Sequence, residues 1–165
     1  MKKFCIMLAI VLLLSCVWGC QQETTEPAGI AFYYCVTDLT FGAQDSVITA
    51  EYRQNIPQDN WAQVLDLYLQ GPTSDTLRSP FPAGLKTLKT TMENTTMYVT
   101  FSEKLASLSG LELTLACSCI CMTCMALSGA ETVVISAEDA LLDGQKSITM
   151  DANTLLLLDI MPEGE

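Results

Sequence analysis

Residues 109–129 read SGLELTLACSCICMTCMALSG, and this stretch predicts a long helix. Ser109 and Glu112 fit a capping box, in which the serine hydroxyl and the glutamate carboxylate cover exposed backbone amides. No glycine or proline interrupts the chain between Glu112 and Leu127, whereas Gly129 is a typical helix stop. We therefore expect a helix that begins near Ser109 and ends near Leu127.

Four closely spaced cysteines in this helix are the main candidates for chemistry: Cys117, Cys119, Cys121 and Cys124. Cys121 and Cys124 have the C-x-x-C spacing that brings two sulfurs onto one metal ion, and the other two could complete the ligand set. At 100° per residue, however, Cys117, Cys121 and Cys124 fall within about 60° of one another, and Cys119 falls on the opposite side. One helix cannot direct all four sulfurs at a single ion. We expect them to pack as small buried apolar side chains, with a metal site or a thiol-exchange site as the alternatives.

Six further segments have the composition or the alternation of β-strands. They are Ile30–Val36, Val47–Tyr52, Leu85–Met92, Met97–Phe101, Thr132–Ile135 and Leu155–Ile160. Glu93 and Asn94 separate two of them as the turn of a hairpin. Residues 136–153 are predicted to be mostly irregular.

A second helix is expected after Asp59, which can cap its first turn. Its apolar face has the i, i+3, i+4, i+7 spacing and consists of Trp61, Val64, Leu65 and Tyr68. Gly71 and Pro72 end this helix, because glycine accepts the left-handed conformation and proline cannot continue a helix. The fold class is therefore α+β, with a small sheet packed against two main helices.

The first twenty residues resemble a bacterial lipoprotein signal. Two lysines are followed by the uninterrupted apolar run Phe4–Leu14 and then by small residues and cysteines. In lipoproteins a cysteine at the cleavage point receives a diacylglyceryl group and becomes the first residue of the mature chain. Cys20 follows Gly19 and precedes a polar run, so it is the preferred lipidation site. Cys16, which follows Ser15, is the alternative.

The composition restricts the possible functions. The chain has 8 basic and 19 acidic residues, and cleavage before Cys20 would remove two of the lysines and leave a net charge of about −13. Such a surface repels phosphate backbones, so nucleic-acid binding is excluded. The absence of histidine removes imidazole catalysis and histidine metal ligands. With Cys20 lipidated, five cysteines remain, Cys35 among them, and an odd number argues against a fully paired disulfide framework.

The stretch Val64–Thr73, VLDLYLQGPT, resembles the helix and Gly-Pro-Thr turn of the GerMN domain, the sporulation and spore-germination family. The other similar segments, in the order of the family, are its first strand (Ile30–Tyr34), its next strand (Ile48–Arg53), its proline-rich loop (Pro80–Gly84) and the second hairpin strand with the following helix cap (Tyr98–Ser102). The resemblance covers about Ile30 to Ile135 and is hard to follow after Ser136. It places Arg53 at the family's basic residue.

This resemblance implies a single compact α/β module related to ring-building, protein-assembly domains. Members of the family are often secreted or lipid-anchored and have no assigned catalytic residues. Arg53 and the turn residues Gly71, Pro72 and Thr73 are then the structural motif. No catalytic residue, metal ligand or cofactor is implied.

The sequence predicts four parts: a signal peptide (1–19), a lipidated Cys20 with a flexible tether (20–29), a GerMN-like domain (30–161) and a short tail (162–165). The predicted protein is not an enzyme. It is a lipid-anchored module on the extracytoplasmic face of the cell membrane that binds or scaffolds an envelope protein in sporulation or spore germination. The alternative is a thiol-dependent metal-binding or redox lipoprotein that uses the cluster Cys117–Cys124.

Overall fold

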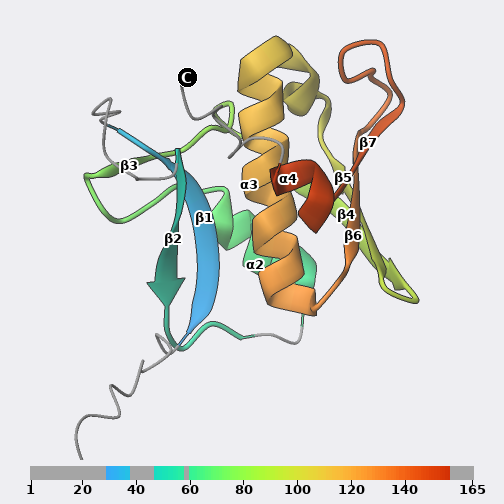
Figure 1. The fold of residues 1–165 in the computed structure, drawn as a ribbon. Helices are drawn as coiled ribbons and strands as arrows, with labels where there is room; N and C mark the ends of the chain where they lie inside the picture. Colours follow the sequence, from blue (N-terminus) through green and yellow to red (C-terminus); the bar gives the residue numbers. More distant parts are fainter. Residues whose placement is uncertain (1–28, 38–46, 58–59, 157–165) are drawn as a thin grey trace, which may run out of the picture.

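A long helix, α3, lies between a three-stranded and a four-stranded β-sheet in the computed structural model of the chain (Figure 1). The structure describes residues 29–37, 47–57 and 60–156. The elements in chain order are β1 (Ile30–Val36), β2 (Ile48–Arg53), α2 (Trp61–Tyr68), β3 (Leu77–Arg78), β4 (Thr87–Glu93), β5 (Thr96–Phe101), the 3-10 helix η2 (Glu103–Ser107), α3 (Gly110–Ser128), β6 (Thr132–Ala137), β7 (Ser147–Asp151) and α4 (Ala152–Leu156). The α+β class is confirmed, although the strands within these ranges form two sheets and not one small sheet.

The connection between β5 and β6 explains the position of α3. The smaller sheet has the strand order β2-β1-β3, and the larger has the order β4-β5-β6-β7. β5 and β6 are parallel neighbours, whereas the other strand pairs are antiparallel. A parallel pair needs a crossover because the end of one strand and the start of the next lie at opposite edges of the sheet. η2 and α3 form that crossover, and α3 packs on β6 and β7 on one side and on β1 on the other (Figure 1).

The central helix is buried around most of its circumference. Its buried positions are Leu113, Ala116, Cys117, Ser118, Cys119, Ile120, Cys121, Thr123 and Cys124. At 100° per residue these positions span roughly 260°, whereas a helix that covers a core from one side needs a stripe of only about 100°. α3 is also long and apolar enough to cross a membrane, but half of its apolar window is buried inside the domain. Contact with a sheet on each side accounts for this composition.

Small side chains allow both sheets to approach the helix closely. Seven of the nine buried positions are alanine, serine, threonine or cysteine. Cys117, Cys121 and Cys124 face the main core, whereas Cys119 lies in a second cluster with Cys35 and Ile48. The five cysteines in the described ranges are all buried, and none of these five is in a disulfide. This arrangement confirms the predicted buried packing and the predicted separation of Cys119 from the other three.

The two ends of α3 differ in how well the sequence predicted them. Gly129 ends the helix in the left-handed conformation, at φ 71°, as expected. The predicted capping box is wrong, because the Ser109 side chain makes no capping hydrogen bond. Instead the Asp143 carboxylate, from a loop far along the chain, accepts a hydrogen bond from the Gly110 amide at 2.8 Å. A negative charge there also stabilises the positive end of the helix dipole.

Helix α2 presents the expected face to the core. Val64, Leu65 and Tyr68 are buried, and Trp61 packs against them half-buried. The N-cap is Asn60, whose side chain accepts from the Gln63 amide at 3.3 Å. The predicted cap, Asp59, lies outside the described residues.

The chain after Ser136 departs most from the prediction. Residues 136–153 are not mostly irregular, since they contain β7, which pairs with β6 from Thr132 to Ser136. Leu155 belongs to helix α4 and not to a strand, and residues 157–160 of the predicted strand lie outside the described ranges. The Asp151 side chain decides this local structure: its carboxylate accepts from the amide and the hydroxyl of Thr154, both at 2.8 Å. An acceptor at this position starts a helix at the end of β7.

Candidate functional site

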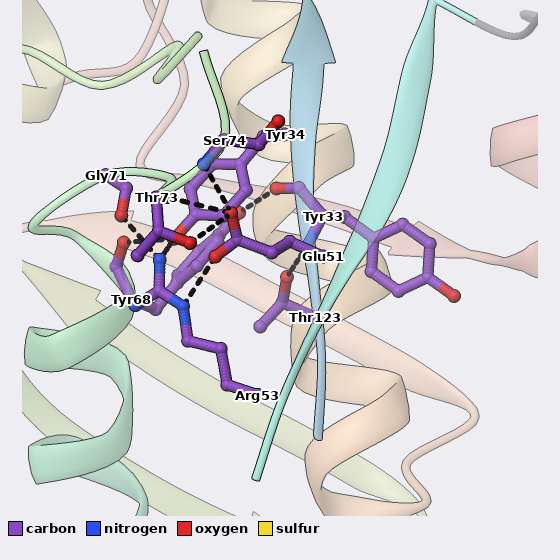
Figure 2. A network of polar contacts seen from close by, with 9 residues as sticks. All are labelled: Tyr33, Tyr34, Glu51, Arg53, Tyr68, Gly71, Thr73, Ser74 and Thr123. Atoms are coloured by element: carbon purple, nitrogen blue, oxygen red, sulfur yellow. Dashed lines mark hydrogen bonds and ion pairs between the residues drawn. The ribbon is translucent and has the colours of Figure 1, made fainter. Parts of the chain in front are cut away.

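The densest polar network in the described chain joins β2 to the turn that follows α2 (Figure 2). Glu51 and Arg53 are two positions apart on β2, so both side chains point to the same face of the sheet. That face also carries the buried rings of β1, because Glu51 is the register partner of Phe32. Arg53 Nε donates to Glu51 Oε1 at 2.6 Å. The side chains are only 16% and 11% exposed, so solvent screens this ion pair much less than one on an open surface.

The second oxygen of Glu51 binds the turn. Glu51 Oε2 accepts from the Thr73 amide at 2.8 Å, the Thr73 hydroxyl at 3.0 Å and the Ser74 amide at 3.0 Å. Burial alone would raise the pKa of Glu51, but hydrogen bonds from Arg53, Ser74 and Thr73 outweigh that effect and hold the pKa below its ordinary value. The carboxylate therefore stays ionised and fixes the turn to the strand.

Arg53 binds the same turn from its other end. One terminal nitrogen donates to the Gly71 carbonyl at 2.6 Å and lies 3.4 Å from the Tyr34 hydroxyl. The guanidinium carbon lies 5.1 Å from the centre of the Phe32 ring and 5.9 Å from that of Tyr34. Lysine could not replace it, because only the planar guanidinium stacks on rings while several donors point outward. Gly71 itself has φ 98°, a conformation that side chains with a Cβ rarely adopt.

Three side-chain hydrogen bonds connect β1 to the two main helices (Figure 2). The Tyr34 hydroxyl donates to the Tyr68 carbonyl at 2.8 Å, which satisfies an acceptor at the end of α2. The Tyr68 hydroxyl donates to the Tyr33 carbonyl at 2.6 Å, and the Tyr33 amide donates to Thr123 Oγ1 of α3 at 3.0 Å. β3 pairs with β1 only at Cys35 and Val36, so these side chains replace the missing strand beside Tyr33. Burial raises the pKa of Tyr68 well above its ordinary value, so its hydroxyl remains a donor.

The groups of this network bind one another and are not free to react. We call the contacts of Glu51 and Arg53 with the turn after α2 the lock. Both oxygens of Glu51 are occupied, and Arg53 is held by a carboxylate and a carbonyl. Within the described ranges, no group of three or more histidine, cysteine or acidic side chains is arranged to hold a metal ion. The alternative metal or redox site at Cys117–Cys124 is not favoured, because its sulfurs are divided between two cores.

The structure places the residues of the predicted motif as follows. Arg53 and Thr73 bind Glu51, Gly71 binds Arg53, and Pro72 lies between the two turn residues. Cys20, the predicted lipidation site, lies outside the described residues. The sequence interpretation missed Glu51, Tyr34 and Ser74. The signal for Glu51 was the spacing Glu-x-Arg within a strand, which puts opposite charges side by side on one face.

Comparison with known proteins identifies the family. A family model described as "Germane: Sporulation and spore germination" matches residues 32–143, which include the whole Glu51–Arg53 network. The chain belongs to the Germane family. This confirms the resemblance carried by the strand, the helix and the Gly-Pro-Thr turn. The Germane match includes Glu51, Arg53 and Gly71, so the lock lies within the family domain.

One solved structure resembles the Germane protein. It is a crystal structure described as a "putative lipoprotein" from Clostridium perfringens, 15% identical, covering 74% of this chain and 86% of that chain with a TM-score of 0.45. A TM-score of this size does not establish a shared fold. A comparison with curated proteins finds no significant match.

Replacement of Glu51 tests the lock. Glu51→Gln keeps the size of the side chain but puts an amide donor where either Arg53 or the turn needs an acceptor. We expect a loss of about 2 kcal/mol in the free energy of unfolding at pH 7, since hydrogen bonds to charged groups contribute about 1.5–3 kcal/mol. Urea unfolding followed by circular dichroism measures it. The matched control is Glu131→Gln, an exposed position, which should change the value by less than about 0.5 kcal/mol.

The pH dependence of the free energy of unfolding, compared between wild type and Glu51→Gln, shows whether the charge of Glu51 or only its shape stabilises the domain. Because the folded-state pKa of Glu51 lies below its unfolded value, its contribution is present above the unfolded pKa, about 4.3, and is lost as pH falls through the folded pKa. The difference between wild type and Glu51→Gln should therefore shrink in acid. An equal difference at pH 7 and near pH 3 would contradict a charge-based lock.

Proposed function

We propose that this Germane protein is a lipid-anchored module on the extracytoplasmic face of the cell membrane, where it assembles with an envelope protein during sporulation or spore germination. Membership of the Germane family, described by sporulation and spore germination, is the observation that carries the proposal. The charged, apolar and small-residue order of residues 1–20 supports export and lipidation at Cys20. Two or more acyl chains would hold the protein stably at the membrane.

A binding role, and not catalysis, fits the chemistry of the described residues. The best-organised polar groups, those of Glu51 and Arg53, are satisfied by one another and by the turn. The chain contains no histidine to act as a general base. A rigid domain of this kind provides surfaces for a partner.

The outer face of the larger sheet is the surface that we propose for the partner. β5 turns Met97, Val99 and Phe101 inward and leaves Tyr98 and Thr100 on the opposite face. Around Tyr98 a shallow hollow of about 300 Å³ is lined by side chains of β4, β5, β6 and β7, mostly hydroxyl-bearing. Tyr98 itself is 39% exposed. A tyrosine surrounded by hydroxyl groups suits a protein interface, because its ring supplies contact area and its hydroxyl a hydrogen bond.

The anchor limits where the partner can be. The tether from Cys20 to the first strand has about nine residues, which reach only some 30 Å when fully extended. The acidic surface is repelled by anionic lipid headgroups, so attachment depends on the acyl chains. The partner should therefore be close to the membrane.

Fractionation of cells tests the anchor. Cys20→Ser should move the protein from the membrane to the soluble fraction, because no thiol remains at the cleavage point. Cys16→Ser is the matched control and should leave the protein in the membrane. Release by Cys16→Ser alone would place the anchor at Cys16, and failure of the wild type to incorporate labelled palmitate would contradict lipidation at either site.

Cross-linking in intact cells tests the partner surface. The wild type should give a discrete cross-linked species with a second protein, and Tyr98→Ala should reduce its yield by roughly tenfold, the size of effect expected when a central tyrosine of an interface is removed. Tyr52→Ala is the matched control: Tyr52 is 46% exposed on β2 of the other sheet and should have no effect. Equal yields from both variants would contradict the proposed surface.

A further inference from the structure

Two of the buried cysteines form a pair that the sequence did not suggest. Cys35 of β1 and Cys119 of α3 are more than eighty residues apart in the chain but belong to one small core cluster with Ile48. Both side chains are 0% exposed. This cluster lies where α3 packs on the smaller sheet, apart from the main core that holds the other three described cysteines. The two thiols are therefore neighbours in a small core cluster that is separate from the main core.

The surroundings of the pair make its two sulfurs unequal. A hydrogen bond from Cys119 lowers the pKa of Cys35, burial opposes this, and the positive charge of Arg78 adds to the lowering, so the pKa lies below its ordinary value. Arg78 is the register partner of Cys35 across the β1–β3 pair. The pKa of Cys119 is raised by the same hydrogen bond and by burial. The result is one sulfur that readily becomes a thiolate beside one that keeps its proton.

The other cysteines lack this arrangement. Burial raises the pKa values of Cys117 and Cys121 to about 12 and that of Cys124 further, and no positive charge offsets it. The Cys121 thiol donates to the thioether sulfur of Met125 at 3.6 Å and not to another thiol. A protonated thiol is a poor nucleophile, so the C-x-x-C pair is the less reactive one.

We propose that Cys35 and Cys119 form a thiol-exchange site, at which a disulfide-bearing oxidant converts the two thiols into a disulfide that joins β1 to α3. The proposal rests on the shared cluster, the strand register and the asymmetry of the pair, and it does not depend on the proposed function. It assigns the redox chemistry to a pair different from the one that the spacing of the cysteines suggested.

The reaction has two balanced steps. The Cys35 thiolate attacks one sulfur of the oxidant, which forms a mixed disulfide and releases the oxidant's other sulfur as a thiolate. The Cys119 sulfur then attacks the Cys35 sulfur, gives up its proton, and releases the second sulfur of the oxidant as a thiol. The two cysteine sulfurs are oxidised and the oxidant disulfide is reduced to two thiols. Cys35 is thus the attacking residue and Cys119 the resolving residue.

Access to the buried pair is through the weakest edge of the smaller sheet. β3 contributes two residues, and it is the strand that pairs with β1 beside Cys35. A pairing this short opens at a lower free energy than the global unfolding of the domain. Oxidation should therefore proceed without unfolding, at a rate set by this local opening.

The test uses the full-length protein in detergent, with Cys5→Ser, Cys16→Ser and Cys20→Ser so that only the five described thiols remain. Oxidised glutathione is the oxidant, under native conditions. We expect the loss of two hydrogens in the intact mass. Digestion with chymotrypsin should yield one linked pair of peptides, and fragmentation of that pair should place the link between Cys35 and Cys119, because Cys117 and Cys121 lie in the same peptide as Cys119. The thermal midpoint should rise by roughly 10 °C, because a link that closes so long a loop restricts the unfolded chain, and dithiothreitol should reverse the rise.

Variants identify the pair independently of the mapping. Cys35→Ala and Cys119→Ala should each abolish the loss of two hydrogens, whereas the matched control Cys117→Ala should retain it. Cys119→Ala should also trap glutathione on Cys35, a mass increase that a purely structural role would not produce. A link between Cys121 and Cys124, no link in the native protein, or a link that lowers the thermal midpoint would overturn the proposal. If one of these variants fails to fold, the position of the link in the protein with all five described cysteines still tests the proposal.

Discussion

Burial of one helix from two sides is the constraint on which this structure depends. α3 contacts β1 on one side and β6 and β7 on the other, so it cannot have a polar face along most of its length. Its buried positions are mostly small, which brings both sheets close to the helix axis. Cysteine meets the need for small apolar side chains at the buried positions of α3, because it is apolar enough to be buried and small enough to fit. The same two-sided packing divides the cysteine sulfurs between two cores.

Polar contacts at the rim of the core add to the attachment of the smaller sheet. Tyr68 and Thr123 satisfy the free edge of β1 at Tyr33, and the Tyr34 hydroxyl satisfies the end of α2. Glu51 and Arg53 then hold the turn after α2 against β2. Each of these groups is occupied within the domain, and for the partner we propose instead the outer face of the larger sheet.

The sequence predicted local structure well and long-range contacts poorly. Helical periodicity identified α2, and the absence of internal glycine and proline identified α3. The spacing of 100° per residue separated Cys119 from its neighbours, because it depends on the geometry of one helix. The cap of α3 could not be predicted, since it comes from Asp143, more than thirty residues away. Likewise β7 depends on pairing with β6, and the Cys35–Cys119 neighbourhood depends on packing between sheet and helix. Arg53 and the turn were selected by family resemblance, whereas Glu51, which connects them, was missed.

Native-state hydrogen exchange of the α3 amides, measured in increasing denaturant, tests the two-sided packing most directly. If α3 joins the two sheets, the amides from Ala116 to Cys124 should exchange only through global unfolding, with the same opening free energy as the slowest amides of β1, β5 and β6. A lower opening free energy for α3 than for the strands on either side would show that the sheets are stable without the helix and would contradict the account.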